Sequence, residues 1–157
     1  MLHPATAHFA VVLPIISFVL GLAYLIKPSE LMSKISTRFM VFATLFLIAA
    51  FFSGKNDAGD VFPLLSDAGQ DVLRAHKDLA LYLVLGMGAA TIVKFYGCFK
   101  QILRIEMFGV FLVAILSAGV LYQAKIGGEL TYQYGANVAQ YSDGMDCIEE
   151  QAELAEE

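Results

Sequence analysis

The chain has 157 residues, of which 58% are hydrophobic and only 16% are charged, and its formal net charge is −5. Soluble domains are about half apolar and about a quarter charged, so this composition indicates a membrane protein. The negative charge and the lack of a basic patch with interleaved aromatic residues exclude a nucleic-acid-binding protein.

Four apolar segments follow one another along the chain, at about residues 4–26, 35–53, 67–99 and 102–124. Each is close to or longer than the roughly 20 residues that a helix needs to cross a bilayer. They are apolar on all faces, as membrane spans are and amphipathic soluble helices are not. The sequence therefore predicts an all-α polytopic membrane protein, a four-helix transmembrane bundle within a single domain at residues 1–138.

Helix-breaking and capping residues set the expected boundaries. Lys27-Pro28 ends the first segment, and Gly54 ends the second. Ser66-Asp67 is typical of a helix start, with Asp67 and Gln70 at a capping-box-like spacing. Gly127-Gly128 is expected to break the fourth helix, leaving an extended or interfacial segment up to residue 138. Residues 139–157 are acidic and poor in large apolar groups, which predicts a flexible tail.

Charge asymmetry predicts the orientation of the bundle. The two short connections, near residues 27–38 and 94–106, hold six basic and two acidic residues, with Lys94 and Glu106 among them. The other side carries the remaining four basic and thirteen acidic residues. The positive-inside rule then places the short connections in the cytoplasm. We expect a multi-pass protein of a bacterial inner membrane, with both termini on the outer, periplasmic side.

This topology brings all three histidines to the outer side of the membrane. His3 and His8 lie at the outer end of the first helix, His76 lies at the outer end of the third, and Asp57 follows the second. Ionisable residues at this depth need a partner or a function. The predicted functional site is therefore this histidine cluster.

One interpretation of the cluster is a haem b held by His8 and His76, with His3 nearby. Helix bundles build cofactor sites from side chains on facing helices, and ligation by two histidines favours electron transfer. Its propionates would be held at the outer surface by basic or phenolic side chains, for which the candidates are Arg74, Lys77, Tyr132 and Tyr134.

Three other interpretations remain open. His3, His8, Asp57 and His76 would suit a transition metal ion, because imidazole and carboxylate are usual ligands. The same residues would equally form a structural hydrogen-bonded plug that needs no cofactor. A proton or solute pathway is disfavoured, because no Asp, Glu or His is expected near the middle of the membrane. Motifs of hydrolases, phosphate loops and dinucleotide sites are absent from the sequence.

Several short patterns resemble a bacterial family of four-helix membrane proteins, catalogued as domain of unknown function 2231. They are Leu2-His3-Pro4, Ala7-His8-Phe9, Gly54-x-x-Asp57, His76, and Gly127-Gly128-x-Leu130-x-Tyr132-x-Tyr134-Gly135. The resemblance covers about residues 2–138 and implies four spans. It also implies that the histidines, Asp57 and the Gly-Gly segment belong to one site, without implying a substrate or a reaction. Family members often have a Phe-Pro pair after the second histidine, whereas Ala10 follows Phe9 here.

The leading functional prediction is a small membrane cytochrome that exchanges electrons with a redox partner protein or a quinone. The alternative is a non-catalytic accessory protein, as an oligomer or as a subunit of a larger membrane complex, whose histidine cluster is structural or binds a metal ion.

Overall fold

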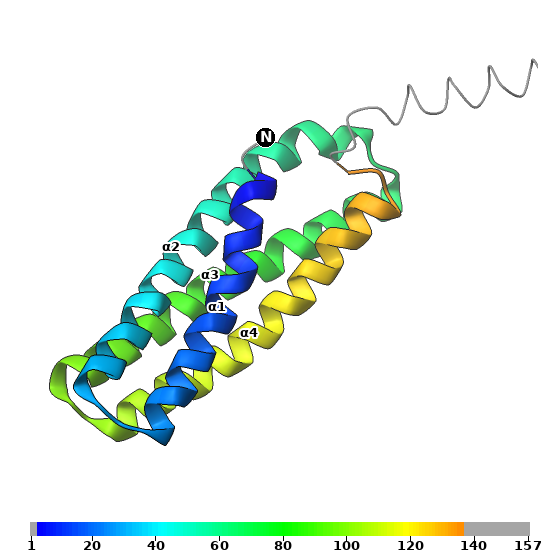
Figure 1. The fold of residues 1–157 in the computed structure, drawn as a ribbon. Helices are drawn as coiled ribbons and strands as arrows, with labels where there is room; N and C mark the ends of the chain where they lie inside the picture. The colour runs from blue at the N-terminus through cyan, green and yellow to red at the C-terminus, as the bar shows by residue number, and fades with distance from the viewer. Residues whose placement is uncertain (1–2, 137–157) are drawn as a thin grey trace, which may run out of the picture.

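The computed structural model describes residues 3–136, which form four long helices and one short 3-10 turn (Figure 1). The elements are α1 (His3–Ile26), α2 (Glu30–Val61), η1 (Phe62–Leu64), α3 (Asp67–Lys100) and α4 (Leu103–Tyr132). All four helices are long and apolar enough to cross a membrane. The predicted all-α bundle of four membrane-spanning helices is confirmed.

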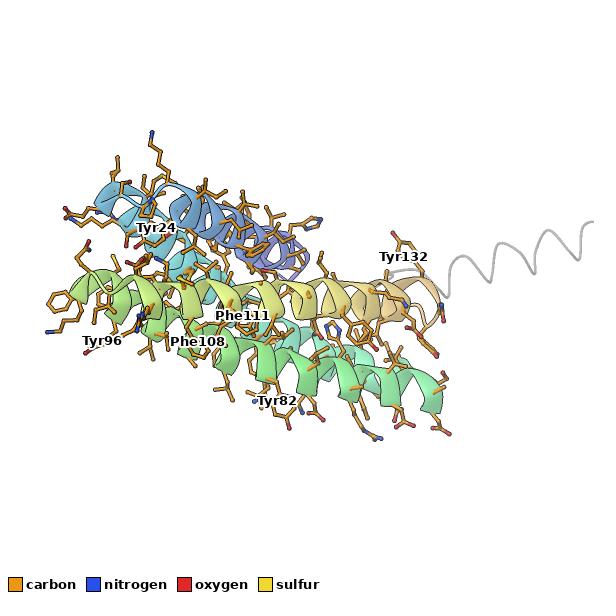
Figure 2. The ribbon with its side chains drawn as sticks, turned by 90° about the horizontal axis from the view of Figure 1, so that it is seen from below. Tyr24, Tyr82, Tyr96, Phe108, Phe111 and Tyr132 are labelled. Carbon is orange, nitrogen blue, oxygen red and sulfur yellow. The ribbon has the colours of Figure 1, made fainter. Side chains whose placement is uncertain are left out.

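The helices run antiparallel as two hairpins, with α1 packed mainly on α2 and α3 packed mainly on α4. Figure 1 shows two tight connections, at residues 27–29 and 101–102, at one end of the elongated bundle. We call this the short-turn end. The opposite end holds the start of α1, the end of α4 and the connection from α2 to α3, and we call it the histidine end. Figure 2 shows Tyr24, Tyr96 and Phe108 toward the short-turn end and Tyr132 at the histidine end.

A regular stripe of mostly small or apolar residues, with one charged residue each in α3 and α4, faces the centre from each helix. Buried positions alternate at spacings of four and three residues, as in left-handed helical packing. The stripes are Ala10, Pro14, Ser17, Gly21 and Tyr24 in α1; Leu83, Met87, Ala90, Lys94 and Gly97 in α3; and Glu106, Val110, Val113, Ser117 and Val120 in α4. In α2, Met40, Leu47 and Ala50 join the same core. Large side chains such as Phe52, Leu85 and Phe111 point outward and are exposed to the surrounding lipid.

The second helix is longer than predicted at both of its ends. Ser29 caps its start by accepting a hydrogen bond from the Met32 amide, at 3.3 Å. The helix then continues past Gly54 to Val61, because glycine is tolerated in a helix and the polar residues that follow leave the membrane without leaving the helix. The cap of α3 is Ser66, whose hydroxyl accepts from the Gly69 amide, whereas Asp67 is already the first helical residue.

The fourth helix also extends beyond its predicted end. It passes through Gly127-Gly128 and ends at Tyr132. Gly135, just after this helix, has a positive φ of 68°, and the Ala136 amide donates back to the Leu130 carbonyl, at 2.9 Å. This pattern is a glycine-dependent helix end, so Gly135 rather than the Gly-Gly pair terminates the helix. The predicted acidic tail, residues 139–157, lies outside the described residues.

Candidate functional site

His3 lies in the first turn of α1 and binds to α2. Its Nδ1 atom lies 3.0 Å from the Ala50 carbonyl oxygen and 3.3 Å from the Ser53 hydroxyl. A carbonyl can only accept, so this contact assigns the proton of the neutral imidazole to Nδ1. A Cβ atom at Gly54 would lie only 2.7 Å from the His3 Cε1 atom, so the glycine makes room for the ring. His3 is therefore oriented by one hydrogen-bonded nitrogen, with Nε2 left as the acceptor.

His76 occupies the equivalent place in the other hairpin. Its ring lies against α4, where a Cβ atom at Gly127 would be 3.2 Å from the His76 Cε1 atom. Its backbone carbonyl accepts a hydrogen bond from Gln123 Nε2, at 2.8 Å. Within the described part of the chain, His76 Nδ1 and Gln123 Oε1 are buried atoms without a hydrogen-bond partner. Each hairpin thus has one half-buried histidine with a glycine beside it.

His8 and Asp57 are placed differently from these two residues. His8 is exposed on α1, whereas His3 is half-buried against α2. Asp57 is half-buried on α2, about one turn beyond Gly54. Among residues 3–136, no group of three or more histidine, cysteine or acidic side chains is arranged to hold a metal ion. His3 and His76 are therefore the two half-buried histidines of the histidine end, one in each hairpin.

The residues predicted to hold haem propionates lie on α3 and at or just after the end of α4. Arg74 is exposed, pairs with Asp71 at 2.9 Å and lies over the Phe62 ring at 5.1 Å. Tyr132 is 91% exposed, at the last turn of α4. Tyr134 packs on the start of α3, where a Cβ atom at Gly69 would lie 3.1 Å from the tyrosine ring. Lys77 is also exposed.

A second polar centre, which the sequence analysis missed, lies inside the short-turn end. Lys94 and Glu106 form an ion pair, and both side chains are fully buried. Glu106 also accepts from Tyr24, at 2.8 Å, and from Ser33, at 2.6 Å. The Lys94 ammonium donates to Thr37 at 3.2 Å and lies 4.8 Å from the centre of the Tyr24 ring. We call these five residues the buried ion-pair centre, to which every one of the four helices contributes.

Two glycines bring the partners of this centre together. A Cβ atom at Gly97 would lie 2.8 Å from Glu106 Cγ and 2.9 Å from the Glu106 backbone nitrogen. One at Gly109 would lie 3.2 Å from the Lys94 Cα atom. The helices α3 and α4 therefore touch nearly backbone to backbone at this point. Burying two charges is costly unless they are paired and hydrogen-bonded, as they are here.

The sequence interpretation had assigned Lys94 and Glu106 to a cytoplasmic connection, and this assignment was wrong. Lys94 lies inside α3 and Glu106 inside α4, each within about two helical turns of the connection. Their signal was present in the sequence. Lys94 continues the spacing of Leu83, Met87 and Ala90, so it lies on the packed face of its helix. An opposite charge in the same stripe of the next helix, just after a tight turn, predicts an internal pair.

Comparison with curated proteins and with solved structures gives no match. The family model described as predicted membrane protein (DUF2231) matches residues 1–140, which include every described helix. The match agrees with the resemblance of the histidine and Gly-Gly motifs and with four helices that are apolar enough to span a membrane. The chain therefore belongs to this family of predicted membrane proteins.

Proposed function

We propose that the protein binds a haem b at the histidine end and transfers electrons, and that His3 and His76 would hold the haem. The observation that supports this proposal best is the orientation of His3. Its Nδ1 is engaged by the Ala50 carbonyl, which leaves the lone pair of Nε2 for a metal. Metal-ligating histidines are commonly fixed in this way, by a hydrogen bond from the other ring nitrogen.

The surroundings of the two histidines also suit a planar cofactor. His3 belongs to the α1–α2 hairpin and His76 to the α3–α4 hairpin, so a group held between them would lie between the hairpins. Because Gly54 and Gly127 have no side chains, no side-chain atom covers the imidazole edges of His3 and His76 at these two positions. His76 Nδ1 and Gln123 Oε1 are buried polar atoms without a hydrogen-bond partner in the described part of the chain, which lowers the stability of the fold. Reorientation of the His76 imidazole on binding a ligand would remove this penalty.

This assignment replaces His8 by His3 in the predicted pair of ligands. His8 is exposed on α1, so it would reach a cofactor between the hairpins only after rotation of that helix. Haem supplies one-electron chemistry, and two histidine ligands leave no coordination position open for a substrate. The function of the chain is then to orient the two imidazoles, while a partner protein or a quinone receives the electron.

The accessory-protein alternative is supported by a different observation. His3 joins α1 to α2 through Ala50 and Ser53, and Gln123 joins α4 to the His76 carbonyl. These bonds stabilise the bundle with or without a cofactor. In that case the histidines would be structural residues of a membrane subunit that acts through its partners.

For the orientation, we propose that the histidine end faces the periplasm of a bacterial inner membrane. The support is the set of exposed charged residues at the short-turn end, to which the buried Lys94 and Glu106 do not belong. It comprises Lys27, Lys34, Arg38, Lys100 and Arg104 against Glu30 alone. An alkaline phosphatase fusion after Ala136 should be active, and an inactive fusion there with an active one at Gln101 would reverse the orientation.

The decisive experiment is a visible spectrum of the detergent-purified protein from haem-replete cells, before and after reduction with dithionite. We expect a Soret band that His3→Ala and His76→Ala abolish and that His8→Ala retains. A band lost in His8→Ala and kept in His3→Ala would restore the original pair of ligands. A colourless, folded wild-type protein would contradict haem binding and favour the accessory role.

A further inference from the structure

A groove runs along the surface of the short-turn end, between α2 and the end of α3. Its volume is about 430 Å³, and its walls include Lys34 and Arg38 from α2 and Phe95, Cys98 and Phe99 from α3. We propose that this groove binds an anionic phospholipid, with the phosphate on the two cations and the first acyl carbons on the two phenylalanines. The proposal is independent of haem, because the groove lies at the opposite end from His3 and His76.

The charges around the groove favour an anion. Arg38 is exposed at the short-turn end, and it forms no hydrogen bond and no ion pair with the side chains of the described residues. Lys34 has only the exposed partner Glu30, which also lines the groove, and such pairs contribute little. The groove therefore has two cations against one carboxylate. Lys100 does not line the groove, but it lies 5.5 Å from the centre of the Phe99 ring. Basic pockets between membrane helices are the usual sites for anionic headgroups.

The apolar wall favours a lipid over a soluble anion. Phe95 is 57% exposed and Phe99 is 73% exposed, so both rings face outward where acyl chains would lie. Arg38 comes two helical turns after Glu30, about 12 Å along the axis, so its long side chain can extend toward the phosphate level while its stem lies against apolar groups. A phosphate without acyl chains would leave the phenylalanine wall exposed.

The floor of the groove is polar but already satisfied. Thr37 lines the groove, is buried, and accepts a hydrogen bond from Lys94 of the buried ion-pair centre. Lys94 contacts Thr37 from inside the bundle and is paired with Glu106, so neither charge is free for a ligand. Recognition is left to the exposed cations and the aromatic wall.

The test compares lipid binding by the purified protein in detergent, using native mass spectrometry and thermal unfolding. The probes are phosphatidylglycerol, phosphatidylcholine and inorganic phosphate. We expect phosphatidylglycerol alone to remain bound and to raise the unfolding temperature. The double variant Lys34→Gln/Arg38→Gln should weaken its binding by about tenfold or more, since each basic residue near an anionic lipid surface adds substantially to affinity.

The matched control is Lys27→Gln/Arg104→Gln, which removes the same charge from the same end without touching the groove. It should change the affinity for phosphatidylglycerol by less than about twofold under the same screening conditions. Equal losses in the two double variants would overturn the site, because they would show only a general attraction to the basic end. An equal thermal shift with inorganic phosphate, or equal binding of phosphatidylcholine, would overturn the proposed ligand.

Discussion

Both ends of the bundle bury polar groups, but within residues 3–136 hydrogen bonds connect these groups across all four helices only at the short-turn end. At the short-turn end, Glu106 accepts from Tyr24, Ser33 and Lys94, so the charges are paired and all four helices are joined. At the histidine end, His3 is bonded only within its own hairpin, and His76 keeps an unpaired buried nitrogen. Completed polar networks fix a structure, whereas incomplete ones indicate a place where a ligand or another conformation is needed.

The largest expected effect comes from breaking the buried ion-pair centre. Glu106→Gln keeps the shape of the side chain but leaves the Lys94 ammonium buried without its countercharge, which should lower the free energy of unfolding by about 3–5 kcal/mol. The matched control is Glu30→Gln, which breaks an exposed pair and should cost less than about 1 kcal/mol. Unfolding in detergent, followed by circular dichroism, measures both.

If Glu106→Gln does not fold, the double variant Lys94→Met/Glu106→Gln keeps the test available. Removing both charges should restore at least part of the lost stability, because the cost of the single change is an unpaired charge. Equal stability losses for Glu106→Gln and Glu30→Gln would contradict the account of this centre.

An intermediate effect is expected where the two helices touch. Gly97→Ala would place a methyl group 2.9 Å from the Glu106 backbone, so α3 and α4 must separate, at a cost of about 1–3 kcal/mol. Gly88→Ala is the control in the same helix, because a Cβ atom there meets nothing within 4 Å. It should be neutral or stabilising by up to about 1 kcal/mol through helix propensity. The same unfolding assay should separate the two variants, and similar values would argue against the close approach.

The smallest expected effect on stability is at the histidine end. His3→Ala removes the hydrogen bond to the Ala50 carbonyl and should lower the free energy of unfolding of the cofactor-free protein by about 1 kcal/mol. Asn56→Ala, at an exposed position near the same end of α2, should leave it unchanged within about 0.5 kcal/mol. A loss for His3→Ala as large as that for Glu106→Gln would show that the two ends are held together in the same way.

The fold was largely predictable from the sequence, because bilayer thickness dictates the length of an apolar helix. Errors occurred where helices leave the membrane. Gly54 and Gly127 were expected to end helices, yet they lie inside α2 and α4 and make room for His3 and His76. A glycine near the end of an apolar segment is typical of both a turn and a close contact, and only the packing distinguishes them.

For the candidate site, the sequence predicts at which end of the bundle its histidines lie, but not which of them are buried. His3 and His8 both fall in the first turns of α1, but the rotation of that helix about its own axis makes one half-buried and the other exposed. Short connections fix which helices are neighbours and leave this rotation to side-chain packing. For the other end, the spacing of Leu83, Met87, Ala90 and Lys94 places Lys94 on the packed face of α3. The number of charges near a connection does not show on which face of a helix each charge lies.

The most direct test of the contrast between the two ends is one thermal melt. Wild-type, Glu106→Gln and His76→Ala proteins are prepared with haem, and each is followed by circular dichroism and by Soret absorbance. We predict that Glu106→Gln has the wild-type band before melting and loses it at a much lower temperature. His76→Ala should lack the band yet unfold close to the cofactor-free wild-type protein. A wild-type protein without the band, or a band lost in Glu106→Gln before any unfolding, would contradict the account.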